Sequence, residues 1–257
     1  MALKRLLKPL NAGLERIGRA TLLVWAILKV LPRPRLYFSS ALQHAYVIGI
    51  QSLPLVLFIA ALGGAVTSQQ SGAQFSGGLP LWVIGSVLAA SMITELAPLL
   101  TAIVMTARVG ASIAAELASM QVTEQIDALR AMGRDPVAFL VVPRVLAGVI
   151  VFPPLVILAN AAGLLAGWAI GQLAVDGLTS ADIIYGMRFY FRPWSLIFSV
   201  IKGTVFGFAV TFTACLVGLE GSGGAEGVGR TTTAAVVITI IMLMVIDVML
   251  APLLKVA

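Results

Sequence analysis

The amino-acid sequence predicts an all-α integral membrane protein, on the evidence of its composition and the length of its apolar stretches. The 257-residue chain is 60% hydrophobic and only 11% charged, with a mean hydropathy of +1.03. A soluble domain of this size needs far more charge to cover its surface. Roughly 20 apolar helical residues cross a bilayer core, and five stretches meet that length. The predicted spans are Ala45–Val66, Leu79–Ala107, Leu146–Leu173, Trp194–Val217 and Thr233–Leu254.

We expect a single domain over residues 1–257, with the transmembrane region at 45–254 and a basic amphipathic helix within residues 1–35. Eight of the 17 Lys and Arg residues lie in this first segment, beside one acid, Glu15. Its apolar residues recur near helical spacing, which is typical of a helix that lies in the membrane interface against anionic headgroups. They are Leu10, Leu14, Ile17, Val24, Trp25 and Leu28. A cytoplasmic helix packed on the protein is the alternative interpretation.

The distribution of basic residues predicts how the chain is oriented. With the N-terminus in the cytoplasm, the cytoplasmic side receives twelve Lys and Arg residues, and the outer side receives three. Cytoplasmic loops carry the excess of positive charge in membrane proteins. We therefore expect a cytoplasmic N-terminus and a periplasmic C-terminus.

The connection between the second and third spans predicts a short amphipathic helix on the cytoplasmic side. Thr123 is a candidate N-cap, and Glu124 and Asp127 place negative charge at the positive end of the helix. Gly133, followed by Asp135-Pro136, is a typical helix end. The apolar stripe of the helix consists of Val122, Ile126, Leu129 and Met132.

Two roles fit this short helix. It can be a packed connector, or it can be a coupling helix that docks in a groove on a cytoplasmic motor. In the second role, the docking residues would be Thr123, Glu124, Gln125, Ile126, Asp127 and Leu129.

Several motifs follow one another along the chain, and together they closely resemble the MlaE/YrbE family of permeases. They are Glu95-Leu-Ala-Pro98, Ala107-Arg-Val-Gly-Ala-Ser-Ile-Ala-Ala-Glu116, Thr123-Glu-Gln-Ile-Asp-Ala-Leu129, Asp135-Pro136, Val142-Pro-Arg-Val-Leu146, Lys202-Gly-Thr-Val-Phe-Gly207, Gly229-Arg-Thr-Thr-Thr233 and Asp247. The resemblance covers nearly the whole chain. In one departure, many relatives carry Arg immediately before the Glu-Leu-x-Pro motif, where this chain has Thr94.

The resemblance implies the permease subunit of an ABC-type transporter in a bacterial inner membrane. It implies a homodimer with two copies of a cytoplasmic ATPase and a periplasmic MCE-domain protein. This assembly would pass phospholipids between the inner membrane and that carrier, and so maintain the lipid asymmetry of the outer membrane. ATP hydrolysis would belong to the partner, so this chain is not expected to be an enzyme and has no candidate catalytic residue.

A lipid cavity is expected near the outer ends of the first two spans. The connection from Thr67 to Pro80 is uncharged and mixes apolar with polar residues, as a cavity for an amphiphile requires. Glu95 lies about halfway along the second span, where an ionisable residue is costly and often functional. The candidate cavity residues are Val66, Gln70, Gln74, Phe75, Leu79, Trp82 and Glu95. The alternatives are a solvated loop and a glutamate that stabilises helix packing.

Lys202 and Asp247 are predicted to form an ion pair inside the membrane. They lie eight and seven residues from the outer ends of the antiparallel fourth and fifth predicted spans. At about 1.5 Å per residue, both are at a similar depth. An unpaired charge there is costly, so opposite charges at one level should meet. The competing possibility is that Lys202 extends toward the interface while Asp247 stays neutral or pairs within a dimer.

Other chemistries are not expected. The stretch from Gly224 to Thr231 nearly matches a phosphate-binding loop, but Arg230 replaces its lysine and a span precedes it where a strand is required. The single cysteine, Cys215, allows no disulfide within the chain, and His44 has no neighbouring ligand in sequence, so we expect no metal site and no cofactor. The basic segment faces lipid, and no nucleic-acid partner is expected.

Two rival functions remain open at this point. A stand-alone, ion-coupled secondary carrier would use Glu95 and Asp247 as relay residues, and would predict inverted repeats, which the sequence does not show. A membrane anchor that only assembles a complex would leave Glu95, Lys202 and Asp247 without a purpose.

Overall fold

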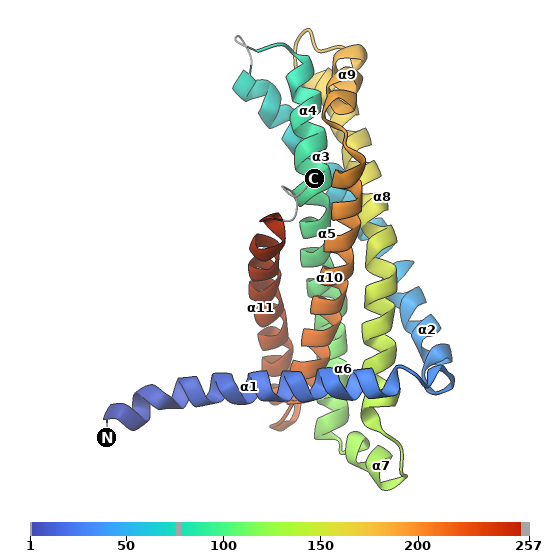
Figure 1. Cartoon of the computed structure of the whole chain (residues 1–257), viewed down its shortest axis with the longest axis vertical. Coiled ribbons are helices and arrows are strands. Elements are labelled where there is room, and N and C mark those ends of the chain that lie inside the picture. Colours follow the sequence, from blue (N-terminus) through green and yellow to red (C-terminus); the bar gives the residue numbers. More distant parts are fainter. Residues whose placement is uncertain (1, 76–78, 253–257) are drawn as a thin grey trace.

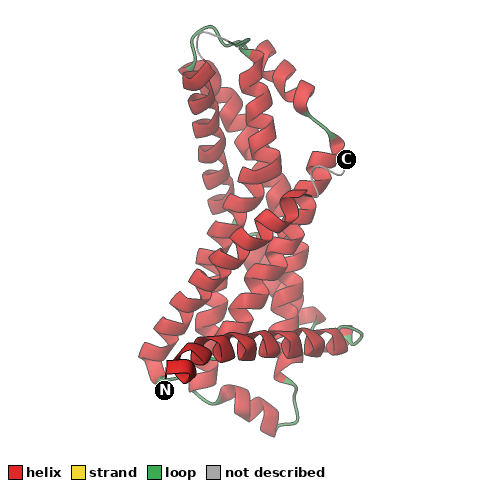
Figure 2. Ribbon diagram, turned by 60° about the vertical axis from the view of Figure 1, so that its left-hand side comes forward, coloured by secondary structure: helices red, strands yellow, loops and turns green. Residues whose placement is uncertain are grey.

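The computed structural model describes residues 2–75 and 79–252, and all regular elements within them are helices (Figure 2). Within these residues, five helical segments are long and apolar enough to cross a membrane. They are Phe38–Phe75, Trp82–Val122, Val137–Ala174, Pro193–Gly218 and Gly224–Leu250. The predicted all-α fold with five spans is therefore confirmed.

The spans are built from helices that single 3-10 or π turns adjoin or interrupt (Figure 1). The helices are α1 (Ala2–Val30), α2 (Phe38–Gly49), α3 (Leu53–Phe75), α4 (Trp82–Ser91), α5 (Ala97–Met105), α6 (Ala111–Val122), α7 (Gln125–Ala131), α8 (Val142–Ala174), α9 (Ser180–Tyr190), α10 (Pro193–Gly218) and α11 (Gly224–Leu250). The turns are the 3-10 turn η1 (Pro34–Leu36) and the π turns η2 (Met92–Leu96), η3 (Thr106–Gly110) and η4 (Val137–Val141).

The first span differs from its prediction at two places. It is interrupted at residues 50–52 between α2 and α3, because Pro54 has no N–H to donate to the Ile50 carbonyl and its ring crowds that turn. It also continues through residues 67–75, which the sequence assigned to a loop. Thr67 and Ser71 donate their hydroxyls to backbone carbonyls one turn earlier, so these polar residues are satisfied inside the helix.

The second span is much longer than predicted. It runs from Trp82 to Val122 without leaving helical geometry, over 41 residues or about 60 Å. Two π turns, η2 and η3, lie inside it, and the first ends just before Pro98, whose ring disfavours a regular helix at that point. Because the length of this helix is about twice the thickness of a bilayer core, its ends extend beyond the hydrocarbon layer.

Helix α9 is an element that the sequence analysis did not predict. A capping box begins it, in which Thr179 Oγ1 accepts from the Asp182 backbone N–H and the Asp182 carboxylate accepts from the Thr179 N–H. It packs closely on α4, where the Ser86 hydroxyl donates to the Gly186 carbonyl at 2.9 Å. We refer to this end of the bundle as the α9 end and to the opposite one as the α7 end (Figure 1).

Helix α1 crosses the bundle near its α7 end, roughly perpendicular to the spans (Figure 1). Leu23 and Ile27 pack against the bundle, while Trp25 and Leu28 remain more than half exposed. Arg19 forms an ion pair with Glu220 at 3.3 Å, where α10 ends. An exposed apolar face on a helix in this position supports the interpretation of α1 as an interfacial helix.

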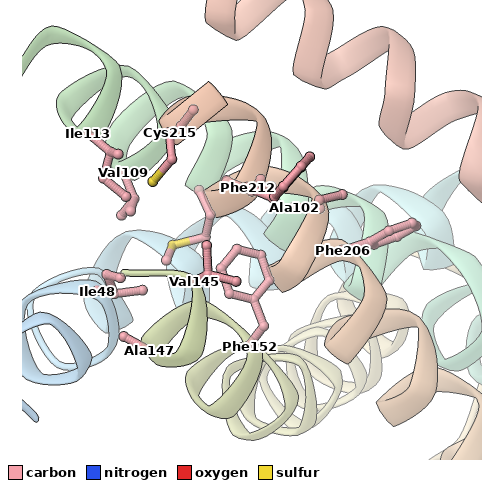
Figure 3. Close-up of a cluster of buried hydrophobic side chains, with 14 of the residues drawn as sticks. Ile48, Ala102, Val109, Ile113, Val145, Ala147, Phe152, Phe206, Phe212 and Cys215 are labelled. Carbon is pink, nitrogen blue, oxygen red and sulfur yellow. The ribbon is translucent and has the colours of Figure 1, made fainter. Parts of the chain in front are cut away.

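The core of the bundle is packed through small residues and aromatic rings. A Cβ built on Gly64 of α3 would lie 1.9 Å from the carbonyl oxygen of Gly163 in α8. A Cβ built on Gly167 of α8 would lie 2.8 Å from the carbonyl oxygen of Gly64. The Gly163-x-x-x-Gly167 pattern therefore serves close packing within this chain. Phe152 and Cys215 are fully buried in the same core (Figure 3).

Candidate functional site

Three charged residues from three different spans meet inside the bundle. Lys202 Nζ of α10 lies 2.5 Å from Glu95 Oε2 of η2 and 2.7 Å from Asp247 Oδ1 of α11. We call Glu95, Lys202 and Asp247 the ion cluster. The structure thus brings together the two residues predicted to pair, and adds Glu95, which the sequence analysis assigned to a cavity wall.

A proline on the second span helps to hold the lysine in place. Pro98 has no N–H to give to the Thr94 carbonyl, four residues earlier. Lys202 Nζ donates to that carbonyl oxygen at 3.1 Å and lies 5.2 Å from the centroid of the Phe198 ring. The fully buried ammonium therefore has two carboxylates, a backbone carbonyl and an aromatic face around it, which offset the cost of its desolvation.

The ion cluster borders a groove on the surface of the bundle, between α3 and the second span. Its volume is about 510 Å³. The lining residues are Val66, Thr67, Gln70, Ser71, Ala90, Ser91, Thr94, Glu95 and Leu96, and we call this cavity the Glu95 groove. Lys202 is fully buried, whereas the Glu95 side chain is 40% exposed, so the cluster presents a carboxylate to the groove.

The groove combines apolar and hydrogen-bonding surface. Val66, Ala90 and Leu96 offer apolar contact, and the hydroxyl and amide side chains of Thr67, Gln70 and Ser91 offer hydrogen bonds. Chemically, such a surface can hold an amphiphile, with its chains on the apolar part and its head near the polar groups.

Three of the seven predicted cavity residues line this groove: Val66, Gln70 and Glu95. Gln74 and Leu79 are exposed outside it, and Phe75 packs with the small apolar cluster under α9. Trp82 contacts the rings of Tyr185 and Phe189 of α9, with centroids 5.7 and 5.0 Å away. These four residues lie at or beyond the end of the first span, where the sequence analysis expected a loop and α3 continues.

The short helix between the second and third spans is α7, and its beginning differs from the prediction. Thr123 does not cap it: this residue ends α6, where its hydroxyl donates to the Ser119 carbonyl at 2.8 Å. Glu124 takes the left-handed conformation, with φ 59°, and α7 begins at Gln125. This change of direction turns α7 away from the axis of α6.

The two faces of α7 differ in exposure. Ile126 is fully buried against the rest of the chain, so it anchors the helix and is not available for docking. Leu129 is partly buried, while Glu124, Gln125 and Asp127 are exposed. Asp127 forms an exposed ion pair with Arg130 at 2.8 Å. The outward surface of α7 is therefore polar and charged.

Two charged residues in the second half of the second span make different contacts. Glu116 of α6 pairs with the buried Arg144 of α8 at 2.8 Å, as expected for a structural ion pair. The described contact of Arg108 in η3 is instead to the backbone carbonyl of Gln51, at the interruption of the first span. The sequence analysis did not anticipate this contact, because it predicted no interruption of the first span.

Comparisons with known proteins agree on one family. The family model described as Permease MlaE matches residues 41–253. A probable ABC transporter permease of Rickettsia felis is 37% identical over 231 residues, which cover 90% of this chain and 89% of that protein. A probable ABC transporter permease of Synechocystis is 32% identical over 90% of this chain and 88% of its own length. The chloroplast protein TRIGALACTOSYLDIACYLGLYCEROL 1 of Arabidopsis thaliana is 34% identical over 88% of this chain and 64% of its own length.

Proposed function

Because the chain belongs to the MlaE family of ABC transporter permeases, we propose that it moves phospholipids between the inner membrane and a periplasmic MCE-domain carrier. It is a multi-pass transporter subunit and not an enzyme. In the proposed assembly, two copies form a homodimer, and two cytoplasmic ATPase subunits drive it. The N-terminus and α7 then lie on the cytoplasmic side, and α9 on the periplasmic side, as the positive-inside rule predicts.

The Glu95 groove is the observation that carries the proposal of a lipid cargo. It lies along a membrane span, has apolar walls beside a few hydrogen-bonding side chains, and includes one carboxylate. A phospholipid has the matching distribution of apolar and polar parts. The name of the Arabidopsis relative is that of a glycolipid, which supports the same class of cargo.

The ion cluster gives the groove a means of responding to its cargo. One ammonium serves two carboxylates and the Thr94 carbonyl. If Glu95 turns from Lys202 toward a headgroup, Lys202 keeps Asp247 and Thr94 as partners and is not left unpaired. The exchange therefore avoids the large cost of a lone buried cation. A lipid that binds one arrangement more tightly shifts the equilibrium between the two by that difference in affinity.

Helix α7 is the proposed contact with the ATPase. Its buried Ile126 holds it to the bundle, and Glu124, Gln125 and Asp127 lie on the exposed surface. Movement of a bound motor would pass from α7 into α6, which belongs to the same helical span as Glu95 and is joined to it through η3 and α5. This continuity supports a mechanical connection between ATP binding and the groove.

Reconstitution tests the proposal. The permease, with the partners that co-purify in mild detergent, is placed in liposomes containing a fluorescent phospholipid. We expect ATP-dependent transfer of that lipid to the soluble carrier, and a large loss of transfer in Glu95→Ala. Transport that persists without any ATPase subunit, driven by an ion gradient, would instead support the secondary carrier.

A further inference from the structure

A second cavity lies between the first and second spans, nearer the α7 end. Its volume is about 420 Å³. It is lined by Gln43, His44, Val47, Ile48, Gln51, Arg108, Val109, Ser112, Ile113 and Glu116, and we call it the Arg108 crevice. It shares no lining residue with the Glu95 groove. The proposed transport mechanism does not involve it.

The crevice extends inward from the level of α1. Arg19 of α1 pairs with Glu220, and a Cβ on the nearby Gly218 would lie 3.1 Å from Ala114 Cα of α6. Glu116 is therefore at about the level of α1. Arg108 precedes it by two helical turns, about 12 Å further into the span. With α1 in the membrane interface, the guanidinium of Arg108 reaches the hydrocarbon layer.

Arg108 has no anionic partner among the side chains that the structure describes, since none of their carboxylates lies within ion-pair distance of it. Its Nη1 donates to the Gln51 carbonyl, which the interruption of the first span leaves available. Glu116 is already paired with Arg144. An arginine in a membrane span is costly unless an anion or polar groups surround it, so this position indicates a ligand.

The chemistry of the crevice suits a phosphate group. A guanidinium has five N–H donors in a fork that matches phosphate oxygens, and the bond to Gln51 leaves most of them free. Arg108 and Ser112 are four residues apart and so share one face of the helix. Arg108 also lies in the π turn η3, a feature found often at functional sites. Val47, which is 48% exposed, adds apolar surface at the edge of the crevice.

We infer that the Arg108 crevice binds the phosphate of a phospholipid headgroup from the leaflet at the α7 end. The acyl chains then lie against exposed apolar residues of the first span, which include Val47, Leu55 and Phe58. The inference rests on the proposed function in taking a lipid as the ligand. It deepens that function by giving a headgroup a second position, in the half of the span that the Glu95 groove does not reach.

The test is site-specific lipid capture in the detergent-purified full-length protein. A photoreactive amino acid replaces Val47, and the protein is illuminated with phosphatidylglycerol or with diacylglycerol of the same chains. We expect capture of phosphatidylglycerol over diacylglycerol, and a loss of about tenfold in Arg108→Gln, since one charge-assisted hydrogen bond is removed. Arg230→Gln, which changes an exposed arginine near the same end of the bundle, should capture as the parent does.

A second variant separates binding from folding. Ser112→Phe fills the crevice while leaving the bond from Arg108 to Gln51 in place, so it should also lose capture. Equal capture of diacylglycerol, or unchanged capture in both variants, would overturn the inference. Binding of inorganic phosphate to the protein without any capture of phospholipid would overturn it too, in favour of a free-anion site. Capture at Val47 needs no ATP and no partner, so it can be measured independently of transport. Lipid transport without capture at Val47 would refute this inference alone. Capture at Val47 without lipid transport would refute the transport proposal alone.

Discussion

Lys202 Nζ lies 2.7 Å from Asp247 Oδ1, across the contact between the antiparallel helices α10 and α11. The same ammonium lies 2.5 Å from Glu95 Oε2, so one cation joins three spans. Such an arrangement is stable only while the cation is present, because the carboxylates around it would otherwise repel each other in a low-dielectric region.

Replacing the lysine should therefore destabilise the fold strongly. We expect Lys202→Met to lower the free energy of unfolding by about 3–5 kcal/mol, the usual cost of removing one partner of a buried ion pair. Lys29→Met is the matched control: Lys29 is exposed and its described contact is the Trp25 ring, so a loss of about 0.5–1 kcal/mol is expected. Thermal unfolding in detergent measures both. Equal midpoints for the two variants would contradict the role given to Lys202.

Exchanging the charges of Lys202 and Asp247 in one double variant should recover part of the expression and transport that each single charge reversal loses. Lys202→Asp creates three neighbouring carboxylates without a cation, and Asp247→Lys creates two cations beside Glu95, so the first should be the more damaging. The double exchange again has one cation and two carboxylates. Expression level and transport should therefore rank the double variant above Lys202→Asp. Defects that simply add in the double variant would argue against a direct pair.

Close packing between α3 and α8 should make Gly64 intolerant of any side chain. A Cβ there would lie 1.9 Å from a backbone oxygen, so Gly64→Ala must push the two helices apart and should cost about 1–3 kcal/mol or more. Gly229→Ala in α11 meets no atom within 4 Å and should be neutral or slightly stabilising. Thermal midpoints of the two variants give the comparison. A stable Gly64→Ala protein would show that α3 and α8 are not in this contact.

The charged surface of α7 should be required for coupling to the ATPase. Reversal of both exposed acids, Glu124→Lys with Asp127→Lys, should abolish either assembly with the ATPase or its stimulation by lipid, while the permease still inserts. Glu226→Lys reverses another exposed acid near the same end of the bundle and should retain both. Co-purification and ATPase assays measure the outcome. Full activity in the double variant would return α7 to the role of a packed connector.

The number of spans and the ion pair between Lys202 and Asp247 could be predicted because both depend on lengths along the chain: the length of an apolar run, and the distance of a residue from the end of its helix. A span needs a minimum run of apolar residues, and the depth of a residue follows from the rise of a helix. Neither inference requires knowledge of which face a residue occupies.

The contact of Glu95 with Lys202 could not be predicted in the same way. Glu95 lies in the π turn η2, which shifts the residues after it around the helix, and an ideal periodicity does not anticipate this. Thr123 was assigned as a cap because its residue type favours that position, but the left-handed conformation of Glu124 moved the boundary. Helix α9 was missed because the sequence analysis looked for stretches long enough to cross a bilayer, although Thr179 and Asp182 carry a signal of its beginning. The Pro54 signal for the interrupted first span was present and was not used.

The most direct test of the account is lipid capture in the Glu95 groove. Gln70 lines the groove, and its neighbour Gln69 is exposed but does not line it. A photoreactive amino acid at each position, in the detergent-purified complex freed of bulk lipid, should capture phospholipid strongly at Gln70 and weakly at Gln69. Addition of a non-hydrolysable ATP analogue should reduce capture at Gln70. Equal capture at both positions, or capture at Gln70 that ignores the nucleotide, would contradict a lipid-carrying groove coupled to the motor.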